Sequence, residues 1–234
     1  MKIRVTVWNE YVHEREYEGI RKNYPEGIHG CIKKFLEKND DIEVRTATLD
    51  MPNQGITEEL LSNTDVLIWW SHERQDEITD ENVELIKKHV HAGMGFIGLH
   101  SAHFSKIMKA LLGTTMTLSW RHGDSEKLWC IAPWHPIAEG VPECIEIPEE
   151  EMYGEPFDIP KPDDIIFLGW FKGGCTFRSG CTFTRGLGKM FYFQPGHEEA
   201  PVYEQAEIQK IITNAVRWAK PQKRLKQAPD NIAL

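Results

Sequence analysis

Apolar residues in the first half of the chain follow two patterns. Four segments have the spacing of β-strands: apolar and polar residues alternate in the first two, and the last two are almost continuously apolar, as in strands buried on both faces of a sheet. These segments are 2–8, 42–49, 65–70 and 95–99. A segment with helical spacing follows each strand, at 27–38, in ITEELL, at 80–90 and in SKIMKALLG, which Gly113 ends. The alternation of strand and helix predicts a doubly wound parallel sheet.

The second half of the chain has a different pattern. Short strand-like segments joined by Pro and Gly turns lie at 127–133, 143–155, 164–171 and 181–193. RGLG inside the last segment is typical of a hairpin turn, and 204–219 has the spacing of an amphipathic helix. We therefore expect one α/β domain over residues 1–220, with antiparallel strands added in the second half. The tail at 221–234 is expected to be loosely held.

Composition narrows the class of protein. The 234 residues include 27 Lys and Arg and 36 Asp and Glu, so the formal net charge is −9. An acidic chain without a basic run is a poor match to nucleic acid or to an anionic membrane surface. No apolar run approaches the roughly 20 residues of a membrane helix. MKIRVTVWNE becomes polar after one short strand, so we expect no signal peptide and a cytoplasmic protein, with its five scattered cysteines reduced.

One motif of nucleotide-binding proteins occurs in the wrong place. Gly93, Gly95 and Gly98 match G-x-G-x-x-G. The dinucleotide fingerprint requires these glycines after a strand and at the start of a helix, whereas here they precede and enter a strand. We therefore expect no nucleotide cofactor.

Histidines follow four of the predicted strands. His13 follows the first strand, His72 the third, His100 the fourth and His197 the last. In open α/β sheets the ligand crevice lies beyond the carboxyl ends of the parallel strands. A single histidine is more often structural than functional, but four histidines at strand ends predict a shared site.

The segment GFIGLHSAHFSK, residues 95–106, has the form of a nucleophile elbow. Its central position, between the small residues Gly98 and Ala102, holds His100 where hydrolases carry Ser or Cys. Ser101 is the weaker nucleophile, because its own flanking residues would crowd a sharp turn, and His197 would have to act as its base.

Two other chemistries rank above acyl transfer at this site. Imidazoles that converge from several strands suit Zn²⁺ or another divalent metal, with His13, His72, His100 and His197 as ligands. Metal-free acid–base catalysis by a pair such as His197 and Glu151 is the other. The residues alone do not rank one above the other.

Several long blocks of the sequence are similar to one known family. VTVWNEYVHE, GMGFIGLHSAHFSKIMKALLGT, EMYGEPFDIP, WFKGGCTFRSG and GKMFYFQPGHE resemble the trehalose utilization (ThuA) family, over roughly residues 3–219. The resemblance implies a flavodoxin-like fold related to the class I glutamine amidotransferases. The elbow cysteine of those enzymes falls on His100, and their late His and Glu fall near His197 and Glu198. Because His100 removes the thiol, we do not expect glutamine hydrolysis.

The resemblance also implies a function and further site residues. It implies catabolism of trehalose or related disaccharides, with oxidised (3-keto) sugars as one substrate class. For a keto sugar the expected step is proton abstraction beside the carbonyl, followed by elimination or isomerisation. His100, His197, Glu151, Tyr153 and Ser101 are the catalytic candidates, and Arg121, Arg178, Trp170 and Glu198 are the candidates for substrate binding.

Two other functions stay open at this point. The chain could be a sugar-binding or regulatory module that keeps the crevice without turnover, since the elbow nucleophile is lost. It could also be a hydrolase that uses Ser101. Aromatic residues of the second half could cover the face of a homo-oligomer or line the crevice, and the residues alone do not decide between the two.

Overall fold

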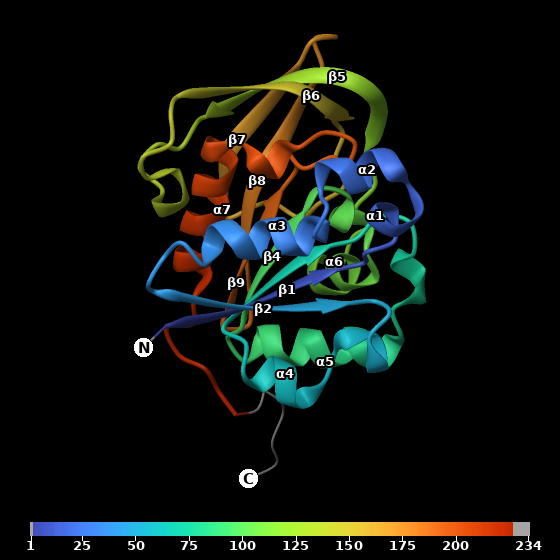
Figure 1. Cartoon of the computed structure of the whole chain (residues 1–234). Coiled ribbons are helices and arrows are strands. Elements are labelled where there is room, and N and C mark those ends of the chain that lie inside the picture. Colours follow the sequence, from blue (N-terminus) through green and yellow to red (C-terminus); the bar gives the residue numbers. More distant parts are fainter. Residues whose placement is uncertain (1, 227–234) are drawn as a thin grey trace.

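The strands form one nine-stranded sheet in the order β2-β1-β3-β4-β9-β8-β7-β5-β6 (Figure 1). The structure is a computed structural model, and it describes residues 2–226. The strands are β1 (Ile3–Asn9), β2 (Ile42–Thr48), β3 (Val66–Trp70), β4 (Gly95–Leu99), β5 (Ser119–Cys130), β6 (Cys144–Gly154), β7 (Asp164–Phe171), β8 (Thr176–Arg185) and β9 (Gly188–Phe193). The neighbours from β2 to β9 are parallel, and those from β9 to β6 are antiparallel. The predicted doubly wound sheet with added antiparallel strands is confirmed.

Helices cover both faces of the parallel half. They are α1 (His13–Glu16), α2 (Glu18–Asn23), α3 (Gly27–Leu36), α4 (Glu58–Ser62), α5 (Asp80–His91), α6 (Lys106–Leu112) and α7 (Ala206–Ala219). Figure 1 shows α3 and α7 together on one face, with α4 and α5 on the other. The caps agree with the sequence: Thr79 accepts the N–H of Asn82 at the start of α5, and Gly113 ends α6 in the left-handed conformation.

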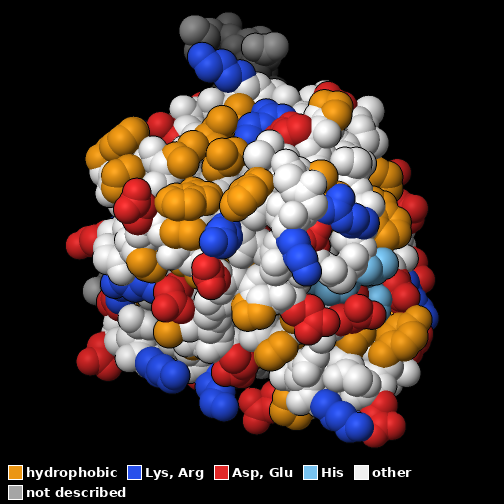
Figure 2. All heavy atoms as spheres, turned by 90° about the horizontal axis from the view of Figure 1, so that it is seen from above, with side chains coloured by type: hydrophobic (Ala, Val, Ile, Leu, Met, Phe, Trp, Pro, Cys, Tyr) orange, Lys and Arg blue, Asp and Glu red, His pale blue; other side chains and the backbone are white. Residues whose placement is uncertain are grey.

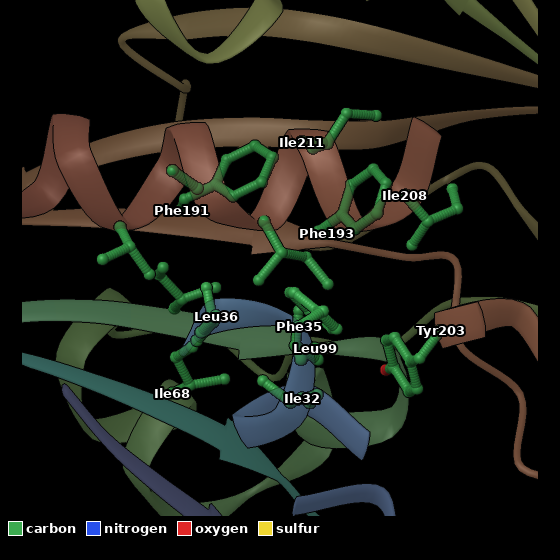
Figure 3. Packing of buried hydrophobic residues seen from close by; sticks show 14 of the residues in the cluster. Ile32, Phe35, Leu36, Ile68, Leu99, Phe191, Phe193, Tyr203, Ile208 and Ile211 are labelled. Atoms are coloured by element: carbon green, nitrogen blue, oxygen red, sulfur yellow. The ribbon is translucent and has the colours of Figure 1, made fainter. Parts of the chain in front are cut away.

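The core has two layers, one on each face of the sheet. In β3, Ile68 and Trp70 belong to the layer under α3 and α7, and Leu67 and Trp69 to the opposite layer. Because successive side chains of a strand point to opposite faces, a strand covered on both sides has to be apolar throughout. Figure 3 shows the first layer, in which Ile68, Leu99, Phe191 and Phe193 pack with Ile32 and Phe35 of α3 and Ile208 and Ile211 of α7.

The structure differs from the sequence prediction mainly at the ends of elements. β5 begins at Ser119, well before the predicted start at 127, because its first five residues are exposed and polar enough to hide the strand pattern. α1 and α2 lie between β1 and α3, where no helix was predicted. Both are very short, so helical spacing is hard to detect in them.

The antiparallel half curves back toward the parallel half. β5 pairs with β6 through register shifts between Arg121 and Glu126, and β7 pairs with β8 through others. Bulges of this kind bend a strand and increase its twist, and Figure 1 shows β5 as a strongly curved ribbon. As a result β6, the last strand at the edge of the sheet, reaches the carboxyl ends of β4 and β9.

The described part of the C-terminal tail contacts the body of the protein. The Arg224 guanidinium donates hydrogen bonds to the carbonyl oxygens of Leu61 and Thr64, and the N–H of Leu225 donates to the carbonyl of Ala92 (2.9 Å). The rest of the predicted loose tail, residues 227–234, lies outside the described residues. Within residues 2–226, no helix is both long enough and apolar enough to cross a membrane.

Candidate active site

His100 occupies the elbow between β4 and α6 in a strained conformation. It opens a 3₁₀ turn, His100–Phe104, with φ of +49°, a region that non-glycine residues rarely adopt outside functional turns. The Tyr192 hydroxyl donates to its carbonyl (3.0 Å), which fixes the backbone. The ring Nδ1 donates to the carbonyl of Gln194 (2.9 Å). Since a carbonyl can only accept, Nδ1 carries a proton and Nε2 is the nitrogen left for chemistry.

β6 supplies the groups that face this nitrogen. Glu151 Oε2 lies 3.2 Å from His100 Nε2, and the Tyr153 hydroxyl lies 3.5 Å from it. The rings of Tyr153 and His100 stack, with centroids 5.1 Å apart. Burial opposes ionisation of Glu151, but His100, His197 and His72 outweigh it and lower the pKa of Glu151 to about 2. Burial raises the pKa of Tyr153 well above its usual range, so that side chain remains a neutral donor.

A buried carboxylate, Glu150, holds the loop after β9 in place. Its two oxygens accept the N–H groups of Glu151 (2.9 Å), Gly196 (2.8 Å) and His197 (3.0 Å). Gly196 has φ of +141°, and a Cβ there would collide with the Tyr203 hydroxyl. Burial is the main reason that the pKa of Glu150 is raised. Glu150 is the middle residue of a run of three glutamates, and nothing in the sequence pattern distinguishes it.

His197 projects from this loop among three carboxylates. Its Nδ1 lies 3.3 Å from Glu198 Oε2 and 3.9 Å from Glu151 Oε2, and its Nε2 lies 3.3 Å from Glu199 Oε2. Burial opposes a charge on the ring, but Glu198, Glu150 and Glu151 outweigh it and raise the pKa of His197 to about 9. His197 is therefore a cation at neutral pH and can donate a proton.

His13 and His72 form a second cluster with Glu198. His13 Nε2 and His72 Nδ1 lie 3.2 Å apart, and Glu198 Oε1 lies 3.5 Å from the first and 3.2 Å from the second. Burial opposes ionisation of Glu198, but its histidine neighbours hold its pKa well below the usual range. Glu10 accepts the N–H groups of His72 and Glu73, each at 2.9 Å, and thereby fixes the loop after β3.

A cavity of about 320 Å³ opens beside both clusters, near the lower end of the ~300–1,000 Å³ typical of small-molecule sites. It is lined by His72, Gln75, Ser101, His103, Phe104, Thr117, Leu118, Trp120, His122, Glu151 and Tyr153. On the face shown in Figure 2, histidine side chains gather in one place beside acidic ones. Trp120 is 59% exposed and offers a ring face on which a sugar can stack.

None of the four predicted substrate-binding residues lines this cavity. Arg121 pairs with Asp124, and Arg178 donates to the Glu155 carboxylate at 2.7 and 2.8 Å. Trp170 lies on β7, its side chain is 46% exposed, and it is not among the residues that line the cavity. The guanidinium groups of Arg121 and Arg178 are therefore engaged in ion pairs with neighbouring carboxylates. In contrast, Glu198 lies between the two histidine clusters.

Ser101 lines the cavity without a base beside it. Its Oγ is buried and has no hydrogen-bond partner among residues 2–226. His103, two residues later in the turn, donates from Nδ1 to the carbonyl oxygen of Met116 (2.7 Å), since a carbonyl can only accept. The serine is therefore present at the cavity but is not activated in the manner of a catalytic triad.

The four histidines predicted as metal ligands are divided between two groups, which are buried except for the half-buried His72. One group is His13, His72 and Glu198, and the other is His100, Glu151 and His197. Both contain the imidazole and carboxylate donors that Zn²⁺ and similar ions prefer. The strand-end argument therefore placed these four histidines at one edge of the sheet, where the structure also has them, but did not resolve the two groups.

Comparisons with known proteins agree with this architecture. A ThuA-like protein from Parabacteroides merdae has the same fold, with a TM-score of 0.70 and 14% identity over 96% of this chain and 93% of that chain. A ThuA-like protein from Bacteroides uniformis has a TM-score of 0.64 and 15% identity over 93% and 91%. The cytoplasmic protein STM1381 from Salmonella typhimurium has a TM-score of 0.61 and 14% identity over 93% and 100%. At these identities the likeness shows the fold alone.

The sequence itself identifies the family. No curated protein matches it. The model of one family, described as ThuA, trehalose utilisation, matches residues 4–219, which is nearly the whole chain. The chain therefore belongs to the ThuA family of trehalose utilisation proteins.

Proposed function

We propose that this protein is an enzyme of carbohydrate catabolism that acts on a disaccharide or an oxidised keto sugar, with His100 and Glu151 as its acid–base pair. The family description supports the substrate class. The approach of His100 Nε2 to Glu151 Oε2, at 3.2 Å, with Glu151 in the wall of the cavity, is the observation that carries the proposal.

The geometry of this pair favours proton transfer. His100 Nδ1 is committed to the Gln194 carbonyl, so only Nε2 can interact with Glu151. A carboxylate oxygen and an imidazole lone pair are both acceptors, and at 3.2 Å they would repel each other unless a proton or a cation lies between them. Both side chains are buried, which strengthens this interaction. We infer that the pair shares a proton that can move during a reaction.

For a keto sugar the residues divide into a base and two acids. The Glu151 carboxylate, which lines the cavity, takes the proton from the carbon beside the ketone. The electron pair of that C–H bond forms a C=C bond as the glycosidic C–O bond breaks, and the His100–Glu151 pair, which then holds two protons, gives one of them to the departing oxygen. Tyr153, neutral and also in the cavity wall, donates a hydrogen bond to the ketone oxygen. The products are an unsaturated keto sugar and the released alcohol.

The test is turnover of trehalose and of 3-keto-trehalose, followed by chromatography and by the absorbance of the conjugated ketone. We expect Glu151→Gln to lower the rate by about 10²–10⁴-fold, the usual contribution of a positioned acid–base group. Glu149→Gln is the matched control, because Glu149 is exposed on the same strand. A Glu151→Gln variant as active as the control would refute the assignment.

A sugar-binding module without turnover predicts a different result in the same experiment. Calorimetry with both sugars would then give saturable binding, and no product would form. The Ser101 hydrolase predicts covalent labelling by a fluorophosphonate. Because Ser101 Oγ has no partner among the described residues, we expect no adduct.

We also propose a cytoplasmic location and a small sugar, rather than nucleic acid, as the partner. All five cysteines are free, as is usual in a reducing compartment. The Salmonella neighbour is itself described as a cytoplasmic protein. Fractionation of cells that produce the protein, with cytoplasmic and periplasmic marker enzymes, tests the location.

A further inference from the structure

Three ligand atoms converge beside the proposed acid–base pair without belonging to it. His13 Nε2, His72 Nδ1 and Glu198 Oε1 form a triangle with sides of 3.2, 3.2 and 3.5 Å. We infer that these three atoms bind one divalent cation of the zinc type, at a site distinct from His100 and Glu151. This inference concerns metal binding and does not depend on the proposed reaction.

The triangle has the size expected of a zinc site. In a tetrahedral zinc site the bonds to imidazole nitrogen and carboxylate oxygen are about 2.0–2.1 Å, so neighbouring ligand atoms lie roughly 3.3–3.4 Å apart. The three observed separations lie on both sides of this value. The triangle therefore has the dimensions of one face of such a tetrahedron.

The chemical types of the three ligands also suit zinc. Two imidazoles and one carboxylate are a common ligand set of catalytic zinc sites, which keep a further position open for water or substrate. His72 lines the cavity, so a cation held by these residues would lie at the cavity wall. Glu73 Oε1 lies 3.4 Å from His13 Nε2 and adds a second negative charge near the site.

Neighbouring residues hold the three ligands in place. Glu10 fixes the backbone of His72 through two N–H groups, and it is 2% exposed. The second oxygen of Glu198 faces His197 Nδ1 at 3.3 Å, as the outer carboxylate oxygen of a metal ligand often faces a donor. His13 and Glu198 are 5% and 3% exposed, and a buried cluster of this kind holds its geometry before a cation binds.

The group formed by His100, Glu151 and His197 fits a metal less well, and a third group, His122, His197 and Glu199, has two exposed members. In the former group His197 Nδ1 lies 3.9 Å from Glu151 Oε2, which is longer than the ligand separations of a tetrahedral site with bonds of about 2.0–2.1 Å. The short contact in it, between His100 and Glu151, is accounted for by a shared proton. The first triangle is therefore the better cation site.

The experiment measures metal directly on full-length protein without a histidine tag. The protein is stripped with a chelator, dialysed and titrated with Zn²⁺ by calorimetry, and separately with Co²⁺, whose visible absorption reports tetrahedral coordination. We expect one equivalent of each ion to bind. His72→Ala and Glu198→Gln should each weaken Zn²⁺ binding by at least tenfold, and the second variant keeps the shape of the side chain.

His100→Ala is the matched control, because it removes a buried histidine from the neighbouring group and leaves the triangle complete. We expect it to bind Zn²⁺ with nearly unchanged affinity. Loss of binding in His100→Ala with retention in His72→Ala would overturn the assignment in favour of the other group. No stoichiometric binding by the wild-type protein would overturn it altogether, and the three residues would then form a hydrogen-bonded cluster only. Since turnover is not measured, neither result decides the proposed function.

Discussion

The buried carboxylate of Glu150 offers the sharpest test of how the site is held together. Glu150→Gln keeps the size of the side chain but replaces one acceptor oxygen with an NH₂ group. If the amide oxygen takes the place of Oε1, it still accepts from Glu151 and His197, but the NH₂ group faces the N–H of Gly196. In the opposite orientation two bonds are lost instead of one.

The magnitude follows from the number of bonds lost. A hydrogen bond to a charged group contributes about 1.5–3 kcal/mol, so at least that much should be lost from the free energy of unfolding. Urea unfolding followed by tryptophan fluorescence measures it, with Glu149→Gln as the control because its side chain is exposed. The loop that carries His197 should also become mobile, so turnover should fall. Equal stability of the Glu150 and Glu149 variants would refute the view that this carboxylate holds the loop.

Three further predictions concern other contacts. Burial opposes ionisation of Asp65, but the contacts with Arg4 outweigh burial and lower the pKa of Asp65. The Asp65 carboxylate therefore stabilises the fold at a pH above its pKa in the unfolded chain, and this contribution disappears as the pH falls. In urea unfolding, Asp65→Asn should lower the free energy of unfolding by about 1 kcal/mol at pH 7 and by much less at pH 3. Gly196→Ala should destabilise the protein by about 1–3 kcal/mol in the same assay, because of its φ and the contact with Tyr203; unchanged stability would contradict this. Trp120→Ala should weaken sugar binding by about 0.5–1.5 kcal/mol in calorimetry, with stability unchanged, if its exposed ring stacks on the sugar.

The sequence predicted where the four histidines meet more reliably than how their side chains are arranged. His13, His72, His100 and His197 could be placed together because the ends of parallel strands meet at one edge of a sheet. That rule concerns the backbone and says nothing of which nitrogen faces which oxygen. The division into two groups depends on side-chain directions and could not be predicted.

The antiparallel half was harder to place in relation to the site. Glu150 belongs to a run of three glutamates, and the run itself does not reveal that Glu150 and Glu151 are buried while Glu149 is exposed. Trp170 and Arg178 lie in blocks shared with the family, but position in a block does not reveal whether a side chain faces the cavity. Glu151 and Tyr153 were found through the family resemblance, since the strand-end rule does not apply to an antiparallel strand.

The curvature of the sheet has a consequence for how the protein responds to a ligand. His100 follows a strand in the middle of the sheet, and Glu151 lies on β6 at its edge. A molecule in the cavity that contacts Ser101, the neighbour of His100, as well as Glu151 ties the two halves of the sheet together across their open side. The binding free energy of that molecule then adds to the stability of the whole folded state. Saturation with substrate should therefore make the antiparallel strands harder to separate from the parallel half, in addition to filling the cavity.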